Sequence, residues 1–188
     1  INDMHYRSEN IMMELFMVTF HYAMIGYYAG MKYIEEMKLR HERIVCFFNE
    51  SSQHFLLCDR MLREELNVNR NEIMPEMDSK LCGALSMMTL AMCNGYHCLY
   101  LENDKKMKLR NHLALIEVYT IAMEYFKSTH FKTSQSYWIS FCNFSSLFHK
   151  ATLAMRMYEY IMDNEKFAEE LEMKDEKVNL TEQLLYMV

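Results

Sequence analysis

Residues 80–101 read KLCGALSMMTLAMCNGYHCLYL, and this stretch decides the fold class. It contains no proline, and Lys80 is its only Lys, Arg, Asp or Glu residue. A helix that is hydrophobic nearly all round is typical of the centre of a helical protein, where neighbours cover it on several sides. Asp78 comes just before the stretch and is a suitable N-terminal cap. We therefore predict a central helix from Asp78 to about Leu101.

The composition of the whole chain favours an all-α fold around this helix. Only four glycines and one proline, Pro75, occur among 188 residues, whereas a β-sandwich or an α/β sheet needs turn residues about every ten positions. Hydrophobic residues make up 51% of the chain, which excludes a disordered protein. We predict a single helical domain over residues 1–188, with five or six helices in sequential antiparallel hairpins. The array is irregular, because no strict tetratricopeptide repeat of about 34 residues is present.

Turn residues and charged segments set the boundaries of the other helices. The stretch GYYAG at residues 26–30 either packs closely against a neighbour or ends the first helix, and we place the break near Gly30. Residues 67–77 carry the single proline and three asparagines, and they form the clearest loop. The helices predicted besides the central one span residues 9–30, 33–66, 107–128 and 137–162, with a sixth helix or a frayed end at 165–177.

Hydrophobic spacing predicts which face of each helix is buried. In the first helix Ile11, Leu15, Val18, Tyr22 and Ile25 recur at steps of three and four, the pattern of one buried face, and Met12, Phe16 and Thr19 widen this face. The same reasoning predicts the inward face of each later helix. In the second helix this face consists of Ile44, Phe47, Ser51, Phe55, Cys58 and Leu62. In the fourth helix it consists of Leu109, Leu113, Ile116, Tyr119, Ala122, Met123 and Phe126, and in the fifth of Trp138, Phe141, Phe144, Phe148, Ala151, Met155 and Tyr158.

Charge and cysteine content limit the possible functions. The formal net charge is −6 and no basic stripe runs along the chain, so we exclude nucleic acid as a partner. Most of the six cysteines lie in hydrophobic helical runs, so we expect reduced, buried thiols and a cytoplasmic location. No uncharged run of about 18 apolar residues is present, and membrane contact is at most peripheral, through the basic run at 105–110. A solvated helix start is the simpler interpretation of that run. Because the chain begins at Ile1, we expect a piece of a longer protein.

No pattern of residues predicts catalysis, a metal or a cofactor. Cys93 and Cys98 are five residues apart and so do not share a helix face, and His41-Glu42 lacks the second histidine of a zinc-protease helix. Cys82, near the start of the central helix, is the one candidate nucleophile, because a helix N-terminus favours a thiolate. A small buried core residue is the favoured interpretation of Cys82.

The sequence resembles the BRO domain, a helical scaffold of endosomal proteins, in stretches that occur in the family's order. They are residues 9–30, 43–62, 75–126 and 147–174, together with Trp138. The longest begins PEMDSKLCGALSMMTLAMCNG and is similar to the family's Pro-Asp loop and its ALSxxxLAQAQE helix. The chain departs from the family where MCNG replaces Gln-Ala-Gln-Glu. It also resembles only the middle of that domain, without the N-terminal sheet or the C-terminal arm.

This resemblance implies a non-enzymatic scaffold that binds the amphipathic C-terminal helix of an ESCRT-III-type protein in a hydrophobic groove. Phe55 matches the position at which the family contributes a phenylalanine to that groove, and Leu81, Leu85 and Met88 lie where the next helix borders it. Ordinary core packing is the alternative interpretation of all four residues. The resemblance also implies association with endosomes.

A second hypothesis is a structural module that self-associates through its Met- and Tyr-rich faces. The GYYAG stretch motivates it, because small residues between tyrosines allow two helices to approach closely. A chain that stays monomeric at every concentration would exclude obligate self-assembly.

Overall fold

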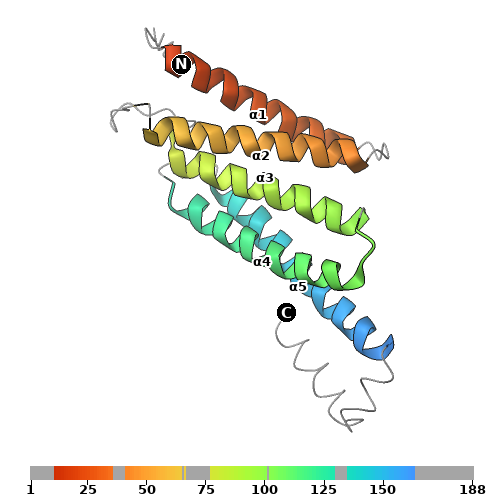
Figure 1. Cartoon of the computed structure of the whole chain (residues 1–188). Helices are drawn as coiled ribbons and strands as arrows, with labels where there is room; N and C mark the ends of the chain where they lie inside the picture. Colours follow the sequence, from red (N-terminus) through yellow and green to blue (C-terminus); the bar gives the residue numbers. More distant parts are fainter. Residues whose placement is uncertain are drawn as a thin grey trace.

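The chain folds into an array of helices that follow one another in space as they do in the sequence. The computed structural model describes residues 11–35, 41–64, 66, 77–100, 102–129 and 135–163. Within these ranges there are five helices and no strand: α1 (Ile11–Glu35), α2 (His41–Glu64), α3 (Ser79–Tyr100), α4 (Lys105–Lys127) and α5 (Gln135–Asp163). Each helix packs mainly against the next one, and α5 lies behind α3 and α4 in Figure 1. The predicted all-α array of hairpins is confirmed, while the sixth helix and the 67–76 loop lie outside the described residues.

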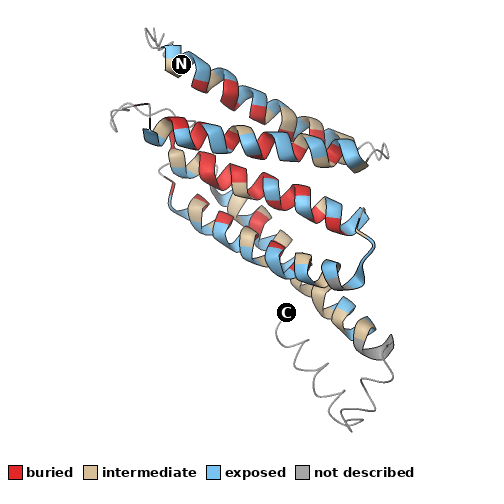
Figure 2. Ribbon diagram, in the orientation of Figure 1, coloured by how far each residue is buried: buried red, intermediate tan, exposed pale blue. Residues whose placement is uncertain are grey.

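Helix α3 forms the centre of the array, as its sequence predicts. It packs against both α2 and α4, and most of its side chains are buried (Figure 2). The Asp78 carboxylate caps its first turn by accepting a hydrogen bond from the backbone N–H of Lys80 at 2.9 Å. Toward α2, Ser52 Oγ donates to the Ser86 carbonyl and Ser86 Oγ donates to the Ser52 carbonyl, each at 2.9 Å. These reciprocal bonds satisfy the polar groups that the close α2–α3 contact buries.

The predicted break near Gly30 is wrong, because α1 continues through GYYAG to Glu35 and α2 begins only at His41. The two glycines lie where α2 comes closest to α1. A Cβ at Gly30 would lie 2.8 Å from a ring carbon of Phe48, and one at Gly26 would lie 2.6 Å from Ser51 Oγ. Close packing, the other interpretation of this stretch, is therefore correct. Because these small residues serve a contact within the chain, they no longer argue for self-association.

The predicted buried face of α1 is wrong along its main row, whose five residues are all exposed: Ile11, Leu15, Val18, Tyr22 and Ile25. Phe16 and Thr19, which were expected to widen that face, are buried. The buried side continues through Phe20, Ala23 and Tyr27 instead. Both sides of α1 are hydrophobic at helical spacing, so periodicity alone cannot choose between them. The side that carries Ala23, Gly26 and Gly30 is buried because only it allows the close approach of α2.

Helices α4 and α5 bury narrower faces than their hydrophobic residues suggest. Leu113 of α4 is exposed, against the prediction, whereas His112 and Leu115 are buried. In α5 the buried residues are Cys142, Ser146 and His149. Four residues that we predicted to point inward from α5 are exposed: Phe144, Phe148, Met155 and Tyr158. The face of α5 toward α4 is thus small and partly polar, and its aromatic face is left open.

Candidate functional site

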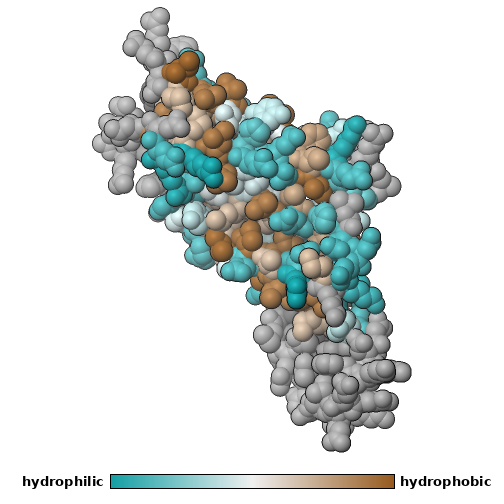
Figure 3. Space-filling view, in the orientation of Figure 1, coloured by the Kyte–Doolittle hydropathy of each residue, from teal (hydrophilic) through white to brown (hydrophobic). Residues whose placement is uncertain are grey.

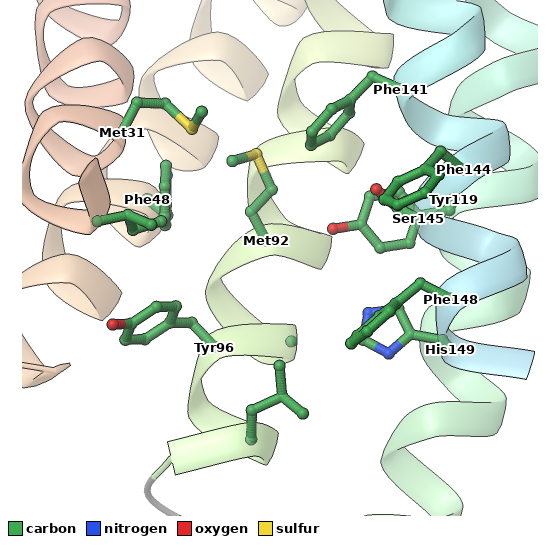
Figure 4. Close-up of a pocket in the computed structure, with 13 residues that line it drawn as sticks. Met31, Phe48, Met92, Tyr96, Tyr119, Phe141, Phe144, Ser145, Phe148 and His149 are labelled. Atoms are coloured by element: carbon green, nitrogen blue, oxygen red, sulfur yellow. The ribbon is translucent and has the colours of Figure 1, made fainter. Parts of the chain in front are cut away.

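An open hydrophobic groove runs over α3 between α1 and α5. Figure 4 shows α3 as its floor, Met31 and Phe48 on one side, and the aromatic residues of α5 on the other. The groove encloses a volume of about 230 Å³. Its lining is Met31 and Ile34 of α1, Phe48 of α2, Met92, Gly95, Tyr96 and Leu99 of α3, Tyr119 of α4, and Phe141, Phe144, Ser145, Phe148 and His149 of α5. We call this set of residues the α3 groove.

The groove is open because α1 and α5 contact each other at one position along their lengths. There the Tyr27 and Trp138 rings meet edge to face, with centroids 5.7 Å apart, and Trp138 stacks on Phe126 of α4 at 6.0 Å. Beyond this aromatic contact α5 packs against α4 rather than α1. The C-terminal half of α1 and the middle of α5 therefore leave one side of the later turns of α3, at Tyr96 and Leu99, open to solvent.

Large hydrophobic side chains are exposed in the groove. Phe144 is 70% exposed, Phe148 is 45% exposed and Leu99 is 36% exposed. A single exposed apolar residue is common on a protein surface, but a contiguous hydrophobic patch marks a binding site. Most of the other lining residues are also hydrophobic, so the groove suits an apolar partner surface.

Two buried histidines connect the groove to the α4–α5 packing. His149 Nδ1 lies 3.0 Å from His112 Nδ1, so one ring donates a hydrogen bond to the other. The Tyr119 ring stacks on His149 at a centroid distance of 5.8 Å. Burial lowers the pKa of His149 to about 4, and the adjacent His112 contributes to this shift. Burial, together with Arg156 and Lys108, lowers the pKa of His112 as well. Both rings are therefore neutral at neutral pH.

The one cysteine beside this pair is not an activated nucleophile. Cys98 Sγ lies 3.8 Å from His112 Nε2, a distance that could permit proton transfer. Burial raises the pKa of the Cys98 thiol and lowers that of the imidazole, so both groups stay neutral. Cys82, the nucleophile considered from the sequence, is fully buried in the core. In the described ranges, no group of three His, Cys, Asp or Glu side chains is placed to hold a metal ion.

The four residues predicted to bind a partner lie deeper than the α3 groove. Phe55 and Met88 are fully buried, Leu85 is almost fully buried, and only Leu81 is partly exposed. The Phe55 ring packs edge to face against Phe20 at 5.5 Å. Phe55, Met88 and Leu85 are therefore core residues, and a partner could not reach their side chains in this conformation. Helical spacing nevertheless carries the stripe of Leu81, Leu85 and Met88 onward into the floor of the groove.

Neither the α3 groove nor the histidine pair could be read from the sequence. Met92, a hydrophobic residue of the predicted central helix, lines the α3 groove. Phe144 and Phe148 had been assigned to the core, so their exposure came only from the structure. His112 and His149 carried no signal of pairing, because 37 residues separate them in the chain.

A basic cluster lies next to the histidines, where the start of α4 meets the end of α5. Lys105, Lys108 and Arg156 line a second cavity of about 190 Å³, and Glu159 is the one carboxylate among the described residues that line it. Arg156 donates to Glu159 at 2.9 Å, so the described lining carries more positive than negative charge. This positive site stands out on a chain with a net charge of −6.

No protein-family model matches the chain, and no curated protein or solved structure shows significant similarity to it. Its function is therefore argued from the groove and its surroundings. Among the helices described, none has both the length and the hydropathy needed to cross a bilayer.

Proposed function

We propose that this chain is a non-enzymatic helical adaptor that binds one amphipathic helix of a partner protein in the α3 groove. The exposure of Phe144 inside a groove of hydrophobic side chains carries this proposal. An amphipathic helix covers such a groove with side chains spaced three and four residues apart. Methionines in the lining favour this use, because flexible thioether side chains adapt to a partner's shape.

The charges around the groove favour a partner helix with acidic residues at one end. Arg156 follows His149 by two helical turns on α5, and with Lys105 and Lys108 it forms the basic cluster. A helix that lies along α5 would bring its end near these cations. Charge pairs at the rim of an interface mainly select the partner and its orientation. We therefore propose an acidic amphipathic helix, with the ESCRT-III-type helix implied by the resemblance to BRO domains as the first candidate.

The direct test is a fluorescence anisotropy titration with a labelled C-terminal helix of an ESCRT-III-type subunit. Burial of three or four hydrophobic anchors provides roughly 4–8 kcal/mol before ordering costs, so we expect a Kd in the micromolar range. Phe144→Asp places a charge in the groove and should raise Kd at least about tenfold. Met155→Asp is the matched control, because Met155 is also exposed on α5 but does not line the groove.

Three further outcomes test the partner's charge, the binding site and the adaptor function in turn. Lys108→Glu should weaken binding of an acidic helix and leave an uncharged helix of the same hydrophobic pattern unaffected. Equal weakening by Phe144→Asp and Met155→Asp would contradict binding in the α3 groove. Failure of every amphipathic helix to bind the folded chain would contradict the adaptor function.

A further inference from the structure

The exposed side of α1 carries a second hydrophobic surface, separate from the α3 groove. Ile11 is 77% exposed, Val18 is 68% exposed and Ile25 is 65% exposed. Leu15 and Tyr22, which lie between them, are each about half exposed. We call these five residues the α1 stripe. Hydrophobic side chains gather over the N-terminal half of α1 in Figure 3.

The stripe extends onto the neighbouring helix. The rings of Tyr22 and His54 lie 4.8 Å apart, which fixes the register of α1 against the antiparallel α2. Leu57 follows His54 by three residues and so lies on the same side of α2, and its side chain is 46% exposed. The surface is therefore wider than one row of side chains, and within the described residues no other helix covers it.

The charge pattern of α1 favours a protein partner over a lipid surface. Helices that lie on membranes carry Lys or Arg along their polar flanks. Between Ile11 and Lys32, α1 has no Lys or Arg, and Glu14 is its only Asp or Glu residue there. An anionic bilayer would repel Glu14, whereas a hydrophobic helix seam tolerates a carboxylate at its edge.

The spacing of the stripe is that of a seam between two helices. Its residues follow one another at steps of four, three, four and three, which is the a/d pattern of a helix pair. The stripe can also pair with itself, because an antiparallel copy places Leu15 against Ile25 and Val18 against Tyr22 on both sides of a two-fold axis. We propose that the α1 stripe is the interface through which two copies of this chain form an antiparallel dimer.

This dimer would be isologous and weak. Each copy would present the same patch, so the pairing closes at two chains and does not propagate into a filament. The contact involves about four turns of one helix per copy, which is small for a stable dimer, so we expect dissociation in the micromolar range. The dimer does not rest on the proposed function, because its interface and the α3 groove use different residues.

Sedimentation velocity of the chain at about 5 to 500 µM tests the proposal, over the range in which small interfaces dissociate. We expect the average mass to rise from the monomer value of 22.7 kDa toward twice that value. Val18→Glu should keep the chain monomeric throughout. Leu113→Glu is the matched control, since Leu113 is 62% exposed on α4, and it should dimerise like the unchanged chain. A monomer at every concentration, or a dimer that survives Val18→Glu, would overturn the proposal.

Cross-linking tests the orientation independently. Cys46, the exposed cysteine, is first replaced by serine. In that chain Leu15→Cys and Ile25→Cys together should form a disulfide-linked dimer under mild oxidation, because the two sites face each other across the seam. The same two cysteines within one chain are about 15 Å apart along the helix and cannot bond. If no linked dimer forms, the antiparallel register is wrong.

Discussion

Mild acid should destabilise the array through His149, which lies between the α3 groove and α4. Its ring is buried and shares a hydrogen bond with His112, at 3.0 Å between the Nδ1 atoms. The groups around the pair are Cys98 of α3, Tyr119 and Lys108 of α4 and Arg156 of α5, and the two cations both lower the pKa of His112. The nearby carboxylates are Glu159, which is paired with Arg156, and Glu102, which acts on Cys98. In the described part of the chain, neither ring has a carboxylate as hydrogen-bond partner. A proton on His149 would therefore be poorly compensated.

The size of this effect follows from the pKa of His149, which burial lowers from 6.5 to about 4. A histidine whose pKa is lower in the folded state contributes its full stability above the unfolded pKa and loses it as the pH falls toward the folded value. At pH 5 the unfolded side chain is almost fully protonated, while only about a tenth of the folded molecules carry this proton. The free energy of unfolding should therefore fall by about 2 kcal/mol between pH 7.5 and pH 5 from this residue alone.

Urea unfolding followed by far-ultraviolet circular dichroism at pH 7.5 and pH 5 measures this loss. Between pH 7.5 and pH 5, the free energy of unfolding of the unchanged chain should fall by about 2 kcal/mol more than that of His149→Gln. The glutamine places a similar polar group at this position but does not titrate. His97→Gln removes an exposed histidine of α3 and should behave like the unchanged chain. If all three chains lose the same free energy on acidification, the reasoning about the buried pair is refuted.

Three further predictions concern packing and exposure. Gly30→Ala should lower the free energy of unfolding by about 1–3 kcal/mol in urea titrations, because the new methyl group would lie 2.8 Å from the Phe48 ring; unchanged stability would contradict this close contact. Phe55→Ala should lower the free energy of unfolding by about 3–5 kcal/mol, and Phe55→Asp should abolish the helical circular dichroism signal, because Phe55 is fully buried. A Phe55→Asp chain that folds would contradict the core position of Phe55. A thiol reagent should label only Cys46 in the native chain, and fast labelling of any buried cysteine would show that the core opens.

The helices were predictable where one signal dominated. Helix α3 is hydrophobic all round and has an N-cap at Asp78, so its extent and central position could be predicted. In α2 the expected Ile44, Ser51, Phe55 and Cys58 are buried, because most residues of its other face are polar. The range of α5 was also close, since a polar loop precedes it.

The face of α1 could not be predicted from periodicity, because both of its sides are hydrophobic. The deciding signal was present in the sequence, although it was interpreted as a break. Ala23, Gly26 and Gly30 recur at steps of three and four, and small residues at that spacing mark the side on which a second helix comes close. When both faces of a helix are hydrophobic, as in α1, a row of small residues is therefore a better indicator of the buried face than a row of large aliphatic residues.

The α3 groove could not be predicted, since it depends on where α5 stops following α1. Trp138 was correctly expected to point inward, and its contact with Tyr27 holds the start of α5 against α1. Farther along, Phe144 and Phe148 would be core residues if α5 continued to lie against α1. Hydrophobic spacing reports only that a side chain prefers burial, and it does not distinguish a neighbouring helix from a partner that binds later.

The groove and the histidine pair depend on the same helix position. A Cβ at Gly95 would lie 3.3 Å from His149 Nε2, so the absence of a side chain at this point lets α5 approach α3 closely. That approach places His149 beside His112 and buries the polar side of α5. The adjacent Phe148 then points about 100° away around the helix, toward the groove. A change that moves α5 away from Gly95 should therefore alter the polar contact and the hydrophobic lining together.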